Sequence, residues 1–379
     1  MNRFKLFLGF LGIALISFTI LFNSCAKKED NSIKVGVILP LTGNLAFLGK
    51  PIQQAFDIFL EDNREYFEKN NISFNILYGD SKGNAGEAVT LANKLIKIDK
   101  VNILMPFLTN VSQAVSPISQ NSNVFTMALC TYPPIVDNPV TVKLFYDFEK
   151  ESRIISDFIN KRGKKNILIL KSNDAASTYQ VDKYFEKYIT QYKIKFNVIE
   201  FKLGNKDFKN IIPTNLNKYD CITVFGFGTD FPEIFKMIHN YGFNFKEKLL
   251  ITGIGTYEIP RTTPYDLIKN VYFTAPTYIV DNKPQFEEFN QKYAQKYKIK
   301  EIPFMSVLAY DNLIAIRELI IKNKSIVYKD GKNIKEELIK IGVFNGISGE
   351  ISISNYGNGS SGISVVKFNN SFESISKAN

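Results

Sequence analysis

The chain has 379 residues, of which 45% are hydrophobic and 22% are charged, as in ordinary folded proteins. This composition excludes a disordered chain and a protein with several membrane spans. The formal net charge is +10, but the lysines are spread along the whole chain, which argues against a nucleic-acid partner. Because domains usually contain roughly 100–200 residues, we expect two of them.

Residues 1–24 have the plan of a lipoprotein signal peptide. Two basic residues precede an uncharged apolar run at residues 6–22, and Ser24-Cys25 at its end resembles a bacterial lipobox. We therefore expect Cys25 to carry lipid and residues 25–32 to form a polar tether to the membrane. An uncleaved membrane anchor is the alternative, although the run is slightly shorter than the roughly 20 residues that a span needs. Both readings place the folded body outside the cytoplasm, in the periplasm or at the cell surface.

The remaining cysteines and the single histidine offer little chemistry. Cys130 and Cys221 lie in or beside apolar runs, so we expect buried thiols, with a disulfide between them as the alternative. His239 is the only histidine, and no group of residues has metal-ligand spacing. We therefore expect no metal, no cofactor and no catalytic residues.

Strands and helices alternate along the chain, as in α/β proteins with parallel sheets. A first series predicts strands at 33–39, 73–78, 101–105 and 124–129, with helices at 52–60, 85–98 and 111–120. After an extended segment at 143–148, a second series predicts strands at 166–170, 196–201, 221–225, 249–252 and 271–274, with helices at 151–161, 181–192 and 232–241. The chain then ends with helices at 285–297, 304–322 and 334–341 and with strands at 349–353 and 362–368. These series predict two doubly wound parallel-sheet lobes.

Five segments, in order, resemble the branched-chain amino acid binding proteins, which are type I periplasmic binding proteins. The most specific is Ile33-Lys34-Val35-Gly36-Val37-Ile38-Leu39-Pro40-Leu41-Thr42-Gly43, which is similar to the first strand and ligand loop of that family. The others are the second loop, the third loop, the late helix and the closing hairpin, at residues 105–109, 129–131, 304–318 and 344–349.

The resemblance implies three hinge crossings between the lobes, near Phe148, Thr274 and Val343. Lobe I would then contain residues 33–148 and 275–343, and lobe II would contain 149–274 and 344–379. The ligand would lie between the lobes, off the carboxyl ends of the strands.

By the same resemblance, the second and third loops hold a ligand carboxylate. The matching positions here are Thr109 and Thr131, with Leu129 in the same third loop. Both threonines carry a hydroxyl that can donate to an anion near a helix start. For a single threonine in a loop, capping of a helix is the alternative role.

At other positions the chain departs from the family. The acidic residue that pairs with a ligand ammonium falls on Gly255, and two aromatic positions fall on Leu48 and Ala176. Asp230 follows a strand and offers a replacement charge, with a helix N-cap as its alternative role. The resemblance therefore supports the carboxylate half of the pocket more strongly than the amino half.

Together these features predict a monomeric solute-binding protein rather than an enzyme. It would capture a small carboxylate-bearing or amide ligand, an amino acid or a related compound, and deliver it to the permease of an ABC importer. The alternative is a lipoprotein regulator or sensor of the same fold with no role in transport.

Overall fold

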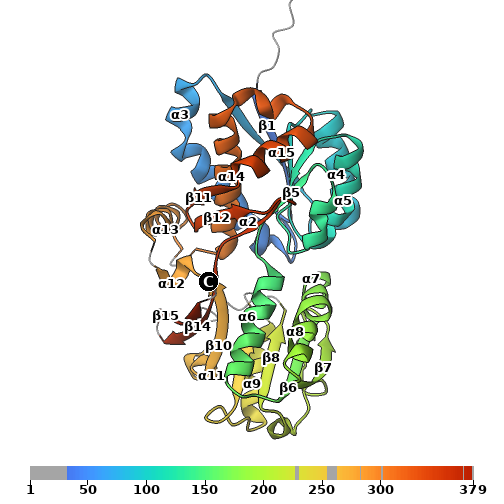
Figure 1. The fold of residues 1–379 in the computed structure, drawn as a ribbon, viewed down its shortest axis with the longest axis vertical. Helices are drawn as coiled ribbons and strands as arrows, with labels where there is room; N and C mark the ends of the chain where they lie inside the picture. Colours follow the sequence, from blue (N-terminus) through green and yellow to red (C-terminus); the bar gives the residue numbers. More distant parts are fainter. Residues whose placement is uncertain are drawn as a thin grey trace, which may run out of the picture.

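The computed structural model describes residues 32–226, 230–253, 263–281, 283–299, 302–369 and 371–377. Cys25, the signal segment and Gly255 lie outside these residues. The described chain forms two lobes, one above the other, with helices on both faces of a sheet in each (Figure 1). No helix in the described ranges is both long and apolar enough to cross a membrane.

The first sheet has eight strands in the order β11-β12-β13-β5-β4-β3-β1-β2. Their bounds, in chain order, are β1 Ser32–Leu39, β2 Ser73–Asp80, β3 Ile103–Pro106, β4 Phe125–Met127, β5 Thr141–Leu144, β11 Val343–Gly346, β12 Gly349–Ile353 and β13 Asn358–Ser360. Strands β1 to β5 run parallel to one another.

Alternate residues of β1 pack on opposite faces of this sheet, as the pleat of a strand requires. Val35 and Val37 belong to the core formed with helices α2 (Ala46–Asp62) and α14 (Phe304–Lys322). Ile38 packs instead with α4 (Ala85–Lys97) and α5 (Thr109–Asn121). Burial on both faces explains why the strand is apolar almost throughout.

The second sheet has seven strands in the order β15-β14-β10-β9-β8-β6-β7. Their bounds are β6 Asn166–Ser172, β7 Lys195–Phe201, β8 Cys221–Phe225, β9 Leu249–Thr252, β10 Val271–Pro276, β14 Ile363–Asn369 and β15 Ser371–Lys377. Strands β6 to β10 are parallel, and β14 and β15 are added antiparallel. One face is covered by α6 (Phe148–Lys161) and α8 (Glu186–Gln191), the other by α9 (Asp230–Asn240).

The predicted two-lobed α/β fold is therefore confirmed. The first crossing leaves β5 and enters α6, and the second leaves β10 for α13 (Pro284–Tyr297), which returns to the first lobe. There the Tyr293 hydroxyl donates to Gln54 Oε1 of α2 at 2.5 Å.

The third crossing lies later than expected. Asn358 and Gly359 of β13 pair with Lys143 and Leu144 of β5, so residues 344–360 extend the first sheet rather than the second. The expected lobe boundary at residue 344 is therefore wrong, and the chain crosses between β13 and β14. The open edge of β5 explains the difference, because an unpaired strand edge is covered by further strands.

The two remaining cysteines of the folded body, Cys130 and Cys221, are buried and free. Burial raises the pKa of both thiols. They are therefore structural, unreactive side chains rather than a disulfide.

Candidate functional site

The carboxyl ends of β3 and β4 bring the predicted second and third loops together. Phe107 and Leu129 form a parallel bridge beyond the two strands, and the Leu108 amide donates to the Leu129 carbonyl at 3.2 Å. Leu108 has φ of 84°, which is uncommon for a bulky residue. The bridge thus holds the chain in a strained turn directly before α5.

Thr109 and Thr131 meet at this point. Their hydroxyl oxygens lie 3.2 Å apart, and the two residues are only 8% and 9% exposed. Thr109 is the first residue of α5, and the preceding Leu108 offers that helix no side-chain cap. The first turn of α5 therefore presents its amides beside two hydroxyls, a combination suited to an anionic oxygen.

Leu129 and Leu48, two further predicted site residues, pack against the core of the first lobe. The Leu129 side chain is fully buried in the core, so this residue acts through its carbonyl. Leu48 lies in the first turn of α2 and is partly buried against the same core. Next to it, a Cβ at Gly49 would lie 2.2 Å from the Pro40 carbonyl oxygen. The glycine is what allows α2 to begin so close to the end of β1.

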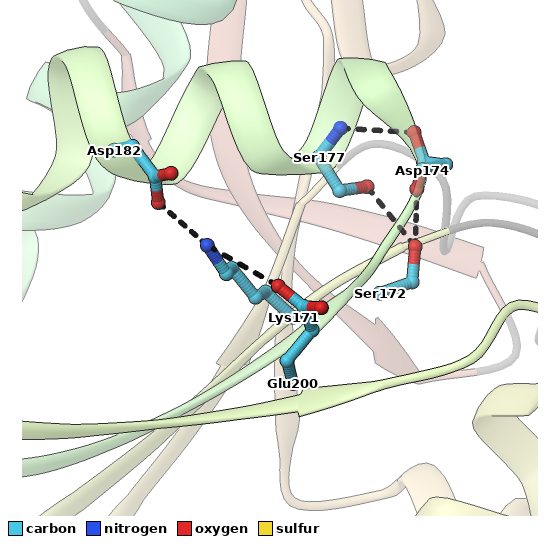
Figure 2. Close-up of polar contacts among 6 residues, drawn as sticks. All are labelled: Lys171, Ser172, Asp174, Ser177, Asp182 and Glu200. Carbon is cyan, nitrogen blue, oxygen red and sulfur yellow. Dashed lines mark hydrogen bonds and ion pairs between the residues drawn. The ribbon is translucent and has the colours of Figure 1, made fainter.

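We use the word wall for the surface that each lobe turns toward the other. The wall of the second lobe is acidic just beyond the end of β6. Asp174 accepts hydrogen bonds from the amides of Ala176 and Ser177, both at 2.9 Å, at the start of α7 (Ala175–Gln180). It also accepts one from the Ser172 hydroxyl, which lies 3.4 Å from that of Ser177 (Figure 2). The start of α7 is thus already capped by a carboxylate, and Ala176 adds no polar side chain there.

The positive charge of the neighbouring Lys171 is not directed at Asp174. Lys171 pairs with Asp182 at 2.6 Å and with Glu200 at 3.7 Å, whereas Ser172 faces Ser177 (Figure 2). Both side chains reach the same helical segment, and the two carboxylates hold the Lys171 cation further along that segment than Asp174.

Asp230 is the first residue of α9 and is 3% exposed. Its Oδ2 accepts the amide proton of Gly204 at 2.9 Å, in the loop after β7. Burial raises the pKa of this carboxyl. The structure thus assigns Asp230 a contact that neither of its predicted roles included.

Sequence reasoning missed a buried acid, Glu151, in the first turn of α6. This residue is fully buried and accepts hydrogen bonds from Tyr146 at 3.2 Å, from Gln180 at 2.6 Å, and from Thr274. The sequence did carry a signal: Glu151 lies three residues after Phe148 and so shares the apolar face of the helix.

Comparison with known proteins identifies the family of this chain. The family model for periplasmic binding proteins matches residues 32–373. The chain belongs to the periplasmic binding protein family. The predicted family is thus confirmed, and membership implies a location outside the cytoplasm. No curated protein sequence matches this chain.

Several solved structures share the fold. The isoleucine complex of the branched-chain amino acid transporter substrate-binding protein LivJ from Streptococcus pneumoniae is 20% identical, with a TM-score of 0.76, over 92% of this chain and 99% of that one. The leucine-binding protein LivK from Thermotoga maritima is 21% identical, with a TM-score of 0.77 and coverage of 92% and 99%. An ABC transporter solute-binding protein from Rhodopseudomonas palustris HaA2, solved with p-hydroxybenzoic acid, is 19% identical, with a TM-score of 0.78 and coverage of 92% and 97%.

Proposed function

We propose that this protein captures a small carboxylate-bearing or amide ligand, an amino acid or a related compound, between its lobes and delivers it to the permease of an ABC importer. The observation that carries the proposal is the meeting of Thr109 and Thr131 at the uncapped start of α5. In a site withdrawn from water, such donors stabilise an anion more strongly than they do at the surface.

The similar structures support this ligand chemistry. Two of them were solved in complex with isoleucine and with p-hydroxybenzoic acid. Both molecules carry a carboxylate, although the rest of each is different. A shared carboxylate site with a variable second half of the pocket accounts for this range.

The two walls differ in electrostatic character, which favours one ligand orientation. The wall of the first lobe combines the two threonine hydroxyls with the amides at the start of α5. The wall of the second lobe carries Asp174 at the start of α7. A ligand would therefore place its carboxylate toward the first lobe and donor groups toward the second.

For transport, the protein must lie at the membrane that contains the permease. Lipid on Cys25 would hold a monomeric body at the membrane surface, beside the permease. Solute-binding proteins of this family capture ligands without converting them, so we propose no catalytic residues.

A thermal-shift screen tests the proposal. Amino acids, short-chain and aromatic carboxylates, and amides are each added, and a ligand at 100 times its Kd stabilises the fold by about 2.7 kcal/mol. We expect a shift with at least one compound and a much smaller one with Thr131→Val. Thr141→Val is the matched control, because the Thr141 hydroxyl is buried in the same lobe and has no hydrogen-bond partner among the residues that the structure describes. A screen in which no compound shifts the wild-type protein would favour a regulator or sensor.

A further inference from the structure

We propose that the end of the second lobe farthest from the first lobe binds an extended polyanion, a polymer that carries repeated phosphate groups. This end, the basic pole, is formed by the segments that lead into strands β6 to β10, at residues 161–165, 192–195, 216–220, 244–248 and 265–270. Its ten cations are Lys161, Arg162, Lys164, Lys165, Lys193, Lys195, Lys218, Lys246, Lys248 and Lys269. The surface lies at the opposite edge of the sheet from the ligand site, so the inference does not depend on ligand capture.

The parallel sheet gathers these cations although they are spread widely along the sequence. Strands β6 to β10 are parallel, so all five begin at the same edge of the sheet. A basic residue stands at most three positions before the first residue of each strand. Helix α6 begins at the first crossing and ends at Lys161, which places this edge at the far end of the second lobe (Figure 1).

Hydrogen bonds between these segments hold them side by side. The Lys195 amide donates to the Lys165 carbonyl at 2.9 Å, and Asp220 Oδ2 accepts the Lys165 amide proton at 3.0 Å. The Lys164 ammonium group donates to the Glu247 carbonyl at 2.5 Å. Because neighbouring strands are about 4.8 Å apart, five of them make the basic pole about 20 Å wide.

Little of the positive charge of the basic pole is neutralised. The same segments contain three carboxylates, which leaves an excess of seven positive charges over the ten cations and these acids. The carboxylates are Asp220, Glu247 and Asp266. Within the part of the chain that the structure describes, Lys269 alone of the ten cations forms an ion pair, with Asp266 at 2.9 Å. Lys248 donates instead to the carbonyls of Asn217 and Tyr219, at 2.5 Å and 2.8 Å, and a carbonyl carries no net charge.

The width and composition of the basic pole favour a polymer over a single small anion. Nine of the ten cations are lysines, which bind phosphates as point charges without the planar geometry of an arginine pair. A small anion would contact the cations of one or two neighbouring segments, whereas a polymer that crosses the strands would contact those of all five. Each such contact releases counterions from the polymer, so many weak contacts add up.

The position of the basic pole favours a polymer over a membrane surface. Strand β1 is in the same parallel set as β5, and β5 leads into the first crossing. Ser32, the first residue of β1, therefore lies at the edge of the first sheet that faces away from the second lobe (Figure 1). The proposed lipid anchor precedes Ser32 in the chain. A body held at that end turns its basic pole away from the membrane.

Binding of the detergent-solubilised full chain to long-chain inorganic polyphosphate tests the proposal. We expect the wild type to bind, with an affinity that falls at least about 100-fold between about 50 and about 200 mM NaCl. The pole variant combines Lys165→Glu, Lys195→Glu and Lys246→Glu, three exposed side chains. It should bind at least about tenfold more weakly and depend less steeply on salt.

A matched control separates the basic pole from net charge. The control variant combines Lys97→Glu, Lys329→Glu and Lys332→Glu, three exposed residues of the first lobe, and changes the net charge equally. It should keep the wild-type affinity to within about threefold. Both variants should melt near the wild-type temperature. If the pole variant melts lower, the same three positions changed to Gln should still weaken polyphosphate binding.

The other outcomes would overturn the proposal. Equal losses in the two variants would show that binding follows net charge rather than the basic pole. Equally strong binding of inorganic phosphate, at the same concentration of phosphorus, would show a site for a small anion. Stronger binding to vesicles of phosphatidylglycerol and phosphatidylcholine than to polyphosphate, lost in the pole variant, would assign the surface to a membrane. A wild type that does not bind polyphosphate would remove the surface altogether, and none of these results bears on ligand capture.

Discussion

Tyr132 and Tyr179 join the two lobes, with ring centroids 4.8 Å apart and planes inclined by 69°. Tyr132 follows Thr131 in the first lobe, and Tyr179 lies in α7 of the second. Tyr179 also packs edge-on against Tyr184, at 5.6 Å and 81°. Because the two rings belong to different lobes, the contact can form only while the lobes are close together.

Removing this contact should favour separation of the lobes. Edge-to-face aromatic pairs contribute about 0.5–1.5 kcal/mol beyond the area they bury. We therefore expect Tyr179→Ala to increase the radius of gyration of the ligand-free protein in solution scattering and to weaken ligand binding up to about tenfold. Tyr356→Ala is the control, because that side chain is 77% exposed. Equal radii in wild type and Tyr179→Ala would show that the pair does not hold the lobes together.

Asp311 of α14 should make stability depend on pH. Its carboxylate accepts the amide protons of Ile347 at 2.7 Å and Ser348 at 3.3 Å, but burial raises its pKa to about 7. Since an unfolded aspartate has a pKa near 3.9, the folded state binds the extra proton between these values. The free energy of unfolding should then fall by about 1.4 kcal/mol per unit as pH rises from about 4 to about 7.

Urea denaturation at several pH values checks this dependence. Asp311→Asn should be less stable at low pH and should show a flatter slope between pH 4 and pH 7, because the titrating group is gone. Asp266→Asn serves as a control on an exposed carboxyl, whose pKa is lowered by its hydrogen bond to Lys269. A slope that Asp311→Asn leaves unchanged would assign the pH dependence to other groups.

Gly49 should tolerate no side chain. Its Cβ would lie 2.2 Å from the backbone oxygen of Pro40, which no rotamer change can relieve. We expect Gly49→Ala to lower the free energy of unfolding by about 1–3 kcal/mol, as overpacking does. Gly86→Ala, in α4, meets only the Asn84 side-chain oxygen at 3.2 Å and should be neutral or slightly stabilising. Equal denaturation midpoints for the two variants would show that α2 shifts without cost.

Cys25→Ser tests the proposed anchor. The variant should lack lipid and should appear in the soluble fraction or as an unprocessed precursor, because the thiol is the site of acylation. Fractionation of cells followed by mass spectrometry measures both outcomes. A variant that stays on the membrane after losing residues 1–24 would show that another contact holds it there.

Most strands and helices could be predicted because apolar runs and helical periodicity are local. The strand at 33–39 and the helix at 304–322, for example, agree with β1 and α14 to within a residue. Which lobe the closing strands join could not be predicted in this way, since β13 pairs with β5 more than 200 residues earlier in the chain. Pairing at a sheet edge depends on tertiary arrangement, not on the pattern of the strand.

The residues of the candidate site could likewise be predicted only in part. Thr109 and Thr131 were located through the resemblance of their loops to a family, and the structure brings their hydroxyls together. Glu151 was missed because an acid in the first turn of a helix is ordinary, and Glu149 stands in the same turn. Only packing separates them: Glu151 is fully buried, whereas Glu149 accepts a hydrogen bond from Tyr188 in a partly buried place.

Calorimetric titration of wild type and Thr131→Val with the best ligand of the screen measures carboxylate binding most directly. Because hydrogen bonds to charged groups contribute about 1.5–3 kcal/mol, the variant should bind roughly 10- to 100-fold more weakly while melting at nearly the same temperature without ligand. The methyl ester of the ligand should bind the wild type about as weakly. Affinity that is unchanged in Thr131→Val, with an ester that binds as tightly as the acid, would contradict a carboxylate site at Thr109 and Thr131.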